Sequence, residues 1–395
     1  MLVSLALIFL VGMSLGFIFK KLKMPSLLGM IITGIVLSPY ALDLLDSSIL
    51  GISAELRQIA LVIILTRAGL SLDINDLKKA GRPALLMCFL PATFEIIGAI
   101  ILAPKFFGIT ILESAILGSV IAAVSPAVIV PRMIKIMESG YGKEKQIPQM
   151  ILAGASADDV FVIVLFTSFT SIAMGENVSF LNYVQIPTSI ILGIIVGIIV
   201  GVFLNFLFKK SHMRDSVKVI IMLSISFLIL GLQTAIENYI QISGLIAIMA
   251  IGITLFKIYP TLSKRLSSKF NKLWVGAEII LFVLVGATVD MNNVAKYGLL
   301  ALAFVLLSLV FRMLGVFISL LKTNLTFKER LFCMFAYCPK ATVQAAIGAI
   351  PLSIGLPCGQ LVLTIAVLSI LITAPLGAFA VDKSYKKLLK LPSNK

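Results

Sequence analysis

Long apolar runs separated by short polar stretches fill almost the whole chain of 395 residues. Because a helix needs about 20 apolar residues to cross a bilayer, this pattern predicts thirteen membrane-spanning segments. In residue numbers, their expected boundaries are 2–19, 26–42, 52–72, 83–103, 110–136, 147–174, 185–208, 216–236, 241–258, 273–289, 297–321, 329–352 and 359–381. The fold class that follows is an all-α polytopic membrane protein.

Two of these segments contain a proline interruption at corresponding places. Thirteen segments divide into two groups of six joined by a linker helix, and the linker inverts the second group in the membrane. Ser125-Pro126 interrupts the fifth segment and Pro339-Lys340 the twelfth, which are equivalent in the two groups. Since proline removes a backbone donor and clashes with the preceding turn, we expect two inverted repeats whose broken helices cross. The alternative is an ordinary proline kink in each segment.

Composition agrees with this architecture. Hydrophobic residues make up 59% of the chain and charged residues only 13%, which excludes an ordinary soluble domain. The first run, Leu2 to Phe19, lacks the basic start and small-residue cleavage site of a signal peptide, so we expect a retained helix. The whole chain, 1–395, is interpreted as one transmembrane transporter unit without an appended soluble domain. It ends in a short basic cytoplasmic tail, residues 382–395.

The net charge of +15 raises the question of nucleic acid, but the basic residues follow the membrane topology instead. Loops after odd-numbered segments carry most of the lysines and arginines, whereas loops after even-numbered segments hold only Lys105 and Lys296. Basic loops stay on the cytoplasmic side. The chain is therefore expected in the cell membrane, with its N-terminus outside and its C-terminus in the cytoplasm, and no nucleic acid partner is expected.

Histidine and cysteine chemistry is not expected. None of the four cysteines forms a CxxC pair, and His212 is the only histidine, so the sequence predicts no resident metal and no cofactor. Any proton transfer then falls to carboxylates. Gly193, Gly197 and Gly201 recur every four residues and predict close helix packing, either within the chain or between two copies.

Asp158 and Asp159 lie inside the predicted span 147–174, which contains no other charge. A charge at the bilayer centre costs roughly 2.5–3.5 kcal/mol, so acidic residues at that depth usually serve ion pathways or proton relays. Neighbouring residues of a helix point about 100° apart, so we expect different roles for the two carboxylates. Together they indicate a protein that binds a monovalent cation, a proton, or each in turn.

Other ionisable residues are buried with them. Arg312 lies about ten residues from either end of its segment, too far to reach water, and the aspartate pair is its expected partner. Lys340, beside the second interruption, is expected to compensate the partial negative charge of free helix ends. Glu95 either neutralises the opposing N-terminal ends or pairs with a base. Glu278 has no assigned partner.

Ser125 adds oxygen ligands at the first interruption. Its hydroxyl and the neighbouring backbone carbonyls are the kind of group that a small cation prefers at a broken helix. With Asp159, these oxygens are expected to hold one monovalent cation. Glu95, Lys340 and Arg312 are expected to balance charge around that site.

Several motifs carry a family resemblance. Residues 155–159 (ASADD) resemble the paired-aspartate motif of the monovalent cation:proton antiporter superfamily. Residues 125–128 (SPAV) resemble its first broken helix, residues 67–73 (RAGLSLD) the end of its third helix, and the Pro/Gly pattern of residues 25–39 its start. The most specific stretch, 339–348 (PKATVQAAIG), is similar to sodium/proton exchangers of the animal mitochondrial-type and lysosomal branch. The resemblance covers nearly the whole chain.

The resemblance implies a homodimer that works by alternating access. Each protomer would contain a scaffold and dimerisation part, about 1–80 and 185–272, and a moving ion-translocating core, about 83–174 and 273–381. The implied activity is exchange of sodium or lithium ions for protons.

The resemblance also implies roles for individual residues. Asp159 matches the carboxylate that binds the cation and the proton, and Asp158 matches one that pairs with a base. That base is usually lysine in the family, and here it is Arg312. Because arginine does not release its proton, electroneutral exchange of one cation per proton is expected, while two protons stay possible if Asp158 titrates.

Three alternatives remain open. A potassium/proton antiporter of the same superfamily is the nearest, although many of these carry a cytoplasmic nucleotide-binding domain. A cation channel would need an open path, and no filter-like loop is visible. An intramembrane aspartyl protease also uses two aspartates, but on two helices that face one water.

Overall fold

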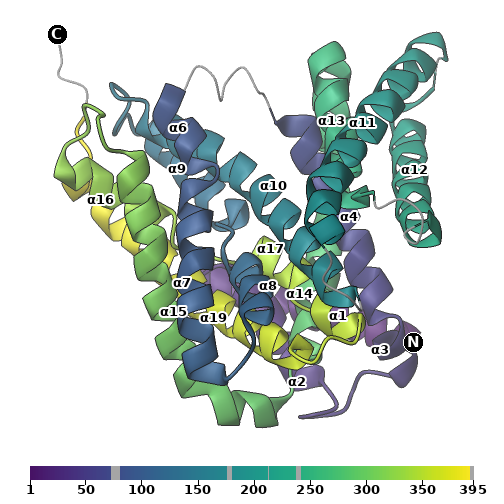
Figure 1. Cartoon of the computed structure of the whole chain (residues 1–395), viewed down its shortest axis with the longest axis horizontal. Coiled ribbons are helices and arrows are strands. Elements are labelled where there is room, and N and C mark those ends of the chain that lie inside the picture. Colours follow the sequence, from purple (N-terminus) through teal and green to yellow (C-terminus); the bar gives the residue numbers. More distant parts are fainter. Residues whose placement is uncertain (73–80, 176–179, 212, 237–241, 392–395) are drawn as a thin grey trace. The chain divides into compact units, whose positions relative to one another are not determined.

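The computed structural model is helical, and no strand occurs in the part of the chain that it describes (Figure 1). The described residues are 1–72, 81–175, 180–211, 213–236 and 242–391, without the side chains of residues 156 and 180–187. Some residues named in the sequence analysis therefore lie outside the described residues, namely Asp73, His212 and residues 392–395.

The helices account for every apolar run that the sequence predicts. Their bounds are α1 Leu2–Lys21, α2 Ser26–Leu37, α3 Ser47–Gly51, α4 Ser53–Ser71, α6 Gly81–Met87, α7 Leu90–Phe107, α8 Ile111–Ile121, α9 Pro126–Glu138, α10 Ile147–Met174, α11 Phe180–Lys210, α12 Asp215–Ile236, α13 Gly244–Ile258, α14 Pro260–Ala287, α15 Met291–Ser319, α16 Phe327–Ala336, α17 Thr342–Ile347, α18 Ile350–Ser353 and α19 Gly359–Leu388. Within the described residues, nine helical stretches are long and apolar enough to cross a membrane, α6 with α7 and α8 with α9 each counting as one. Shorter apolar helices lie at 26–37, 244–258 and 342–353.

Prolines explain two boundaries that differ from the prediction. Helix α2 ends at Leu37 rather than at residue 42, because Pro39 disfavours helical backbone at the residue before it. The predicted segment 83–103 is two helices, α6 and α7, and Pro91 lies in the first turn of α7. Proline suits a first turn, where its missing N–H has no intrahelical partner in any case.

Two other helices are longer than predicted. Helix α14 begins at Pro260 rather than at residue 273. Its basic first half is amphipathic, since Leu262, Leu266 and Phe270 recur every four residues on one face and are fully buried. Helix α19 continues to Leu388, so the first half of the predicted tail is helical.

The chain divides into two compact units. The first contains residues 1–54, 75–166 and 281–395, and the second contains residues 55–74 and 167–280. The broken segments and both aspartates of α10 belong to the first unit.

In the second unit, the glycine face of α11 packs against α13. A Cβ atom added to Gly193 would lie 2.6 Å from the carbonyl oxygen of Ser243, and one added to Gly197 would lie 2.5 Å from that of Ala247. Of the two uses predicted for this face, the structure shows packing within the chain.

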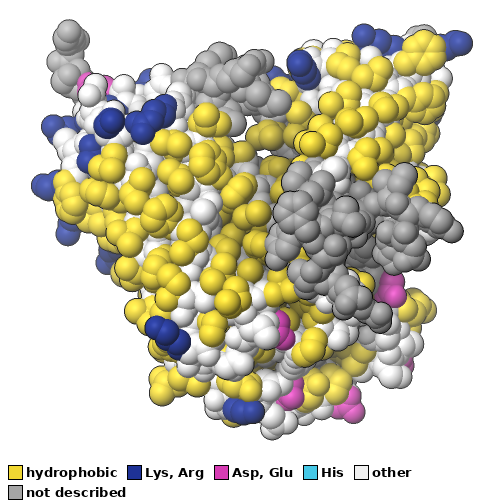
Figure 2. All heavy atoms as spheres, in the orientation of Figure 1, with side chains coloured by type: hydrophobic (Ala, Val, Ile, Leu, Met, Phe, Trp, Pro, Cys, Tyr) yellow, Lys and Arg dark blue, Asp and Glu magenta, His cyan; other side chains and the backbone are white. Residues whose placement is uncertain are grey.

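In the first unit, α7 packs along α15, and a hydrophobic cluster joins α9, α10, α16 and α19 through Met133, Ile151, Phe332 and Val381. The outer face of α15 keeps large apolar side chains exposed, as expected for a helix that faces lipid. Figure 2 shows hydrophobic side chains over much of the visible face of α7 and α15, with lysines and arginines gathered toward the end where α9 and α16 lie.

Candidate functional site

Two helix breaks lie side by side in the first unit. Helix α8 ends at Ile121 and α9 begins at Pro126, and between α16 and α17 the chain is non-helical over residues 337–341. The backbone N–H of Ser125, in the first break, donates to the carbonyl of Pro339, in the second, at 2.8 Å. Both interruptions predicted from proline are therefore true breaks rather than kinks, and they touch each other.

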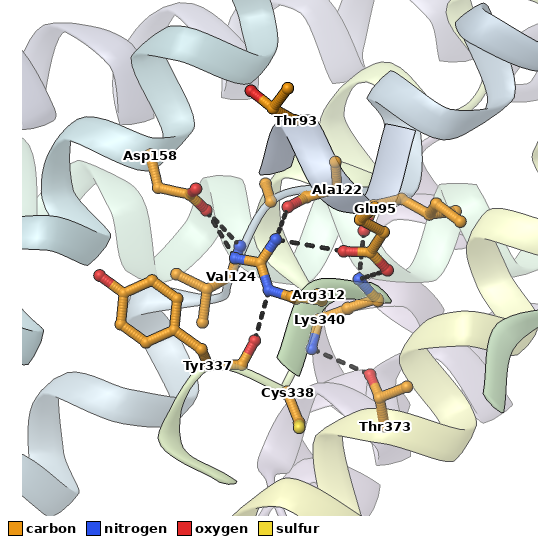
Figure 3. Close-up of polar contacts among 12 residues, drawn as sticks. Thr93, Glu95, Ala122, Val124, Asp158, Arg312, Tyr337, Cys338, Lys340 and Thr373 are labelled. Atoms are coloured by element: carbon orange, nitrogen blue, oxygen red, sulfur yellow. Dashed lines mark hydrogen bonds and ion pairs between the residues drawn. The ribbon is translucent and has the colours of Figure 1, made fainter. Parts of the chain in front are cut away.

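Arg312 joins the two breaks to α10, the helix that carries Asp158 and Asp159. The guanidinium group is fully buried and has four acceptors (Figure 3). Its Nη2 donates to Asp158 Oδ2 at 2.8 Å, its Nη1 to Glu95 Oε2 at 3.1 Å and to the carbonyl of Ala122, and its Nε to the carbonyl of Tyr337 at 2.6 Å. The pair of Arg312 with Asp158 that the sequence predicts is present, and Glu95 is a second anionic partner that the sequence did not assign to it.

Lys340 holds the end of α8 against α7. Its ammonium group donates to Glu95 Oε1 at 2.6 Å and to the carbonyl of Ile121, the last residue of α8. Its backbone N–H donates to Thr373 Oγ1 on α19 at 2.9 Å. Lys340 thus compensates a helix C-terminus, as expected, and Glu95 pairs with bases rather than with helix N-termini.

Gln344, which belongs to the motif at residues 339–348, is a further residue of this cluster for which the sequence predicted no role. From α17, its Nε2 donates to the carbonyls of Ile121 at 3.3 Å and Ala123 at 2.8 Å. The carbonyl between these two accepts from the guanidinium group described above. Three successive carbonyls at the first break therefore each receive a side-chain donor, a need that follows from the unpaired carbonyls of any helix end.

The charges of this cluster balance with one exception. Glu95 and Asp158 supply two negative charges, and Arg312 and Lys340 supply two positive charges, all four at 0% exposure. Asp158 also accepts the N–H of Val124 at 2.9 Å. Asp159 is 9% exposed and makes no ion pair among the described residues. It is the carboxylate whose charge the cluster does not neutralise.

Oxygen atoms without a hydrogen-bond partner lie in the same region. Asp159 Oδ1, Asp158 Oδ1 and Ser125 Oγ are buried and have no partner among the described residues. The Val124 N–H binds Asp158, so the residue before Ser125 contacts the residue before Asp159. Hard cations such as sodium prefer oxygen ligands.

Glu278 does not belong to this cluster. It lies on the second-unit part of α14, where Arg67 of α4 is the opposite charge that acts on it. Among the described residues, no group of three or more His, Cys, Asp or Glu side chains could hold a metal ion.

Comparison with known proteins decides the family. The family described as sodium/hydrogen exchanger, transmembrane, matches residues 5–382. The chain belongs to the sodium/hydrogen exchanger family. Its activity is accordingly sodium/proton exchange across a membrane, and it is a transporter rather than an enzyme.

Individual exchangers match over most of the chain. Sodium/hydrogen exchanger 9B2 of Homo sapiens is 31% identical over 383 residues, which cover 93% of this chain and 70% of the human protein. Sodium/hydrogen exchanger 9B1 of Mus musculus is 31% identical over 377 residues, 93% of this chain and 66% of the mouse protein.

A solved structure shares the fold of this exchanger. The sodium proton antiporter MjNhaP1 from Methanocaldococcus jannaschii, determined at pH 8, superposes with a TM-score of 0.84. The alignment covers 97% of each chain at 21% sequence identity. The predicted membership of the cation:proton antiporters is confirmed, and the all-helical membrane fold with it.

Proposed function

We propose that the sodium ion and the proton compete for Asp159. The observation that carries this proposal is the charge balance around Arg312, because four buried charges cancel and leave one carboxylate over. A lone carboxylate in an apolar interior is costly. It is stabilised either by taking a proton or by binding a cation, and it cannot hold both at once.

This competition couples sodium transport to proton transport, because one carboxylate binds only one of the two ions at a time. Protonated Asp159 is neutral and has no affinity for sodium, while ionised Asp159 binds sodium together with Ser125 Oγ, nearby carbonyls and Asp158 Oδ1. Either occupied state can cross a hydrophobic barrier, whereas the bare carboxylate is too costly to bury. Alternating access of the occupied states then gives exchange.

We propose that Asp158 has a different role, as the anchor of the broken helices. Its pair with Arg312 and its contact with the Val124 N–H connect α10 to the first break. Since Arg312 keeps its proton and Lys340 is held by Glu95, the remaining proton carrier is Asp159. One cation per proton, an electroneutral exchange, is the stoichiometry that this arrangement favours.

The membrane topology is part of the same proposal. Thirteen spans, two inverted six-helix repeats and crossing broken helices fit the touching breaks at Ser125 and Pro339. The distribution of lysine and arginine supports an outside N-terminus and a cytoplasmic C-terminus in the cell membrane.

We propose a moving core of residues 83–174 and 273–381 and a scaffold that contains residues 185–272, assembled as a homodimer. Residues 1–54 form part of the compact unit of the core in this structure. Assignment of residues 1–80 to the scaffold rests on the family resemblance. Chemical cross-linking in native membranes tests the dimer, and a purely monomeric protein would contradict it.

The decisive experiment is proton flux in proteoliposomes, with sodium, lithium and potassium added in turn. We expect sodium and lithium to drive proton movement, and a valinomycin voltage clamp to leave the rate unchanged. Asp159→Asn is expected to abolish exchange, because an amide neither titrates nor offers a full charge to the cation. Exchange that persists in this variant would contradict the site assignment. Voltage-dependent exchange would assign a second proton, and potassium-driven exchange would favour the potassium/proton alternative.

A further inference from the structure

Tyr337 is a large buried side chain next to the site that the exchange mechanism above does not use. It follows α16 directly, at the start of the second break, and its exposure is 0%. Its backbone carbonyl accepts the Nε–H of Arg312 at 2.6 Å, and the guanidinium carbon lies 5.5 Å from the centre of its ring. One residue therefore supports Arg312 with both its backbone and its ring.

The phenol group of Tyr337 packs directly against Gly154 of α10. A Cβ atom added to Gly154 on α10 would lie 2.2 Å from the Tyr337 Oη atom, a distance that no methyl group tolerates. The same Cβ would lie 3.0 Å from Met87 Cβ. The glycine is needed here for close approach of an aromatic side chain rather than for backbone conformation.

Gly154 and Asp158 are four residues apart and share one face of α10. Because of this spacing, a series of contacts within the first unit begins and ends on the same face of α10. Gly154 seats Tyr337, the Tyr337 carbonyl holds Arg312, and Arg312 pairs with Asp158 on the helix that carries the glycine. Figure 3 shows Tyr337 and Asp158 on the same side of the Arg312 guanidinium group.

We propose that Gly154 and Tyr337 are a matched pair of positioning residues, which set the place of Arg312 relative to Asp158 and thereby the sodium affinity of the site. This inference rests on the proposed function of Asp159. Because Tyr337 is fully buried, close packing leaves its ring little room to rotate away from a methyl group at Gly154, and the displacement passes to the Tyr337 backbone and its carbonyl. Arg312 then loses its alignment with Asp158, and the neighbouring cation ligands are displaced.

The test is a rescue experiment in proteoliposomes. Gly154→Ala is expected to raise the apparent sodium KM by about tenfold, since small misplacements in a preorganised site have large effects. Alanine is a better helix former than glycine, so a weakened helix cannot explain that result. Adding Tyr337→Phe removes the atom that collides, and the double variant Gly154→Ala/Tyr337→Phe is expected to recover most of the affinity.

Matched variants separate positioning from general packing. Gly29→Ala also creates a collision, 2.5 Å from the Leu15 backbone, but in the packing of α1 with α2. Tyr337→Phe is not expected to rescue it. A mere folding defect lowers the maximal rate per milligram of protein and leaves the sodium KM unchanged.

Two outcomes would overturn the proposal. One is a Gly154→Ala protein that exchanges with an unchanged sodium KM, and the other is a double variant no better than Gly154→Ala. If Gly154→Ala does not fold, Tyr337→Leu against Tyr337→Phe decides, since only the leucine lacks the ring and is expected to raise the KM. Loss of exchange in Asp159→Asn is measured separately, so failure of the proposed function is distinguishable from failure of this pair.

Discussion

The two helix breaks contribute different groups to the buried cluster, since the first presents backbone carbonyls to side-chain donors and the second carries side-chain donors of its own. The first break, residues 122–125, supplies acceptors, because three successive carbonyls at the end of α8 take side-chain donors. The second break and the helix that follows it supply donors, through Lys340 and Gln344. A broken helix in an apolar interior exposes backbone groups that must be satisfied. For the three carbonyls of the first break, the donors come from the second half of the chain.

This comparison explains why the two halves are not interchangeable. The two breaks meet in the structure, and the four buried charges around them cancel because each half of the chain contributes one sign. Glu95 and Asp158 come from the first half, and Arg312 and Lys340 come from the second. The variants below each remove a charge, a donor or an acceptor from this cluster.

Arg312→Ala is expected to have the largest effect on stability. It removes the only ion-pair partner of Asp158 among the described residues and one of the two basic partners of Glu95, and the carbonyls of Ala122 and Tyr337 lose their donor. Breaking even one buried pair costs about 3–5 kcal/mol. We expect loss of exchange and a marked fall in the thermal unfolding temperature in detergent. Wild-type unfolding and transport would contradict the role of Arg312.

Lys340→Met is expected to be somewhat milder. Glu95 keeps its contact with Arg312, and the Ile121 carbonyl keeps Gln344, but the cluster gains one unbalanced negative charge, at a cost of about 3 kcal/mol. Adding Glu95→Gln removes that charge and is expected to restore part of the lost stability in the same thermal assay. A double variant no more stable than Lys340→Met would show that the charge balance is not the cause.

Gln344→Leu tests the neutral donor of the second half. The Ala123 carbonyl loses its donor, and an unsatisfied buried carbonyl costs about 1–3 kcal/mol. We expect a lower unfolding temperature with exchange reduced rather than lost. Gln149→Leu on α10 is the matched control, since it removes a glutamine with no role at the first break. Equal effects of the two variants would remove Gln344 from the site.

Ser125→Ala is expected to change stability least. The Ser125 hydroxyl has no partner among the described residues, while the backbone bond to Pro339 survives the substitution. Because the substitution breaks no side-chain hydrogen bond among the described residues and removes a buried hydroxyl without a partner, we expect little change in the unfolding temperature. The apparent sodium affinity is expected to fall several-fold if the hydroxyl is a cation ligand. Unchanged sodium affinity would exclude that role and leave only the backbone function.

The sequence by itself determined the helices and the chemistry of the site. Apolar runs of bilayer length locate the helices, because a membrane interior tolerates little else. Prolines at 126 and 339 locate the breaks, since proline cannot continue the hydrogen-bond pattern of a helix. Asp158, Asp159 and Arg312 stand out because ionisable residues are rare at that depth and need a partner or a function.

Only the tertiary structure decided which partners meet. Glu95 bridges two bases, Gln344 closes the first break, and Gly154 seats Tyr337, and none of these contacts follows from local spacing. Glycine and tyrosine are ordinary residues of membrane helices, and a single glutamine carries no charge, so their residue types do not identify a site. Their roles depend on partners that are distant in the sequence. Gly154 and Tyr337 are 183 residues apart, and Glu95 and Lys340 are 245 residues apart. Sequence periodicity reports the environment of a position, whereas the identity of its neighbour is set by how the helices pack.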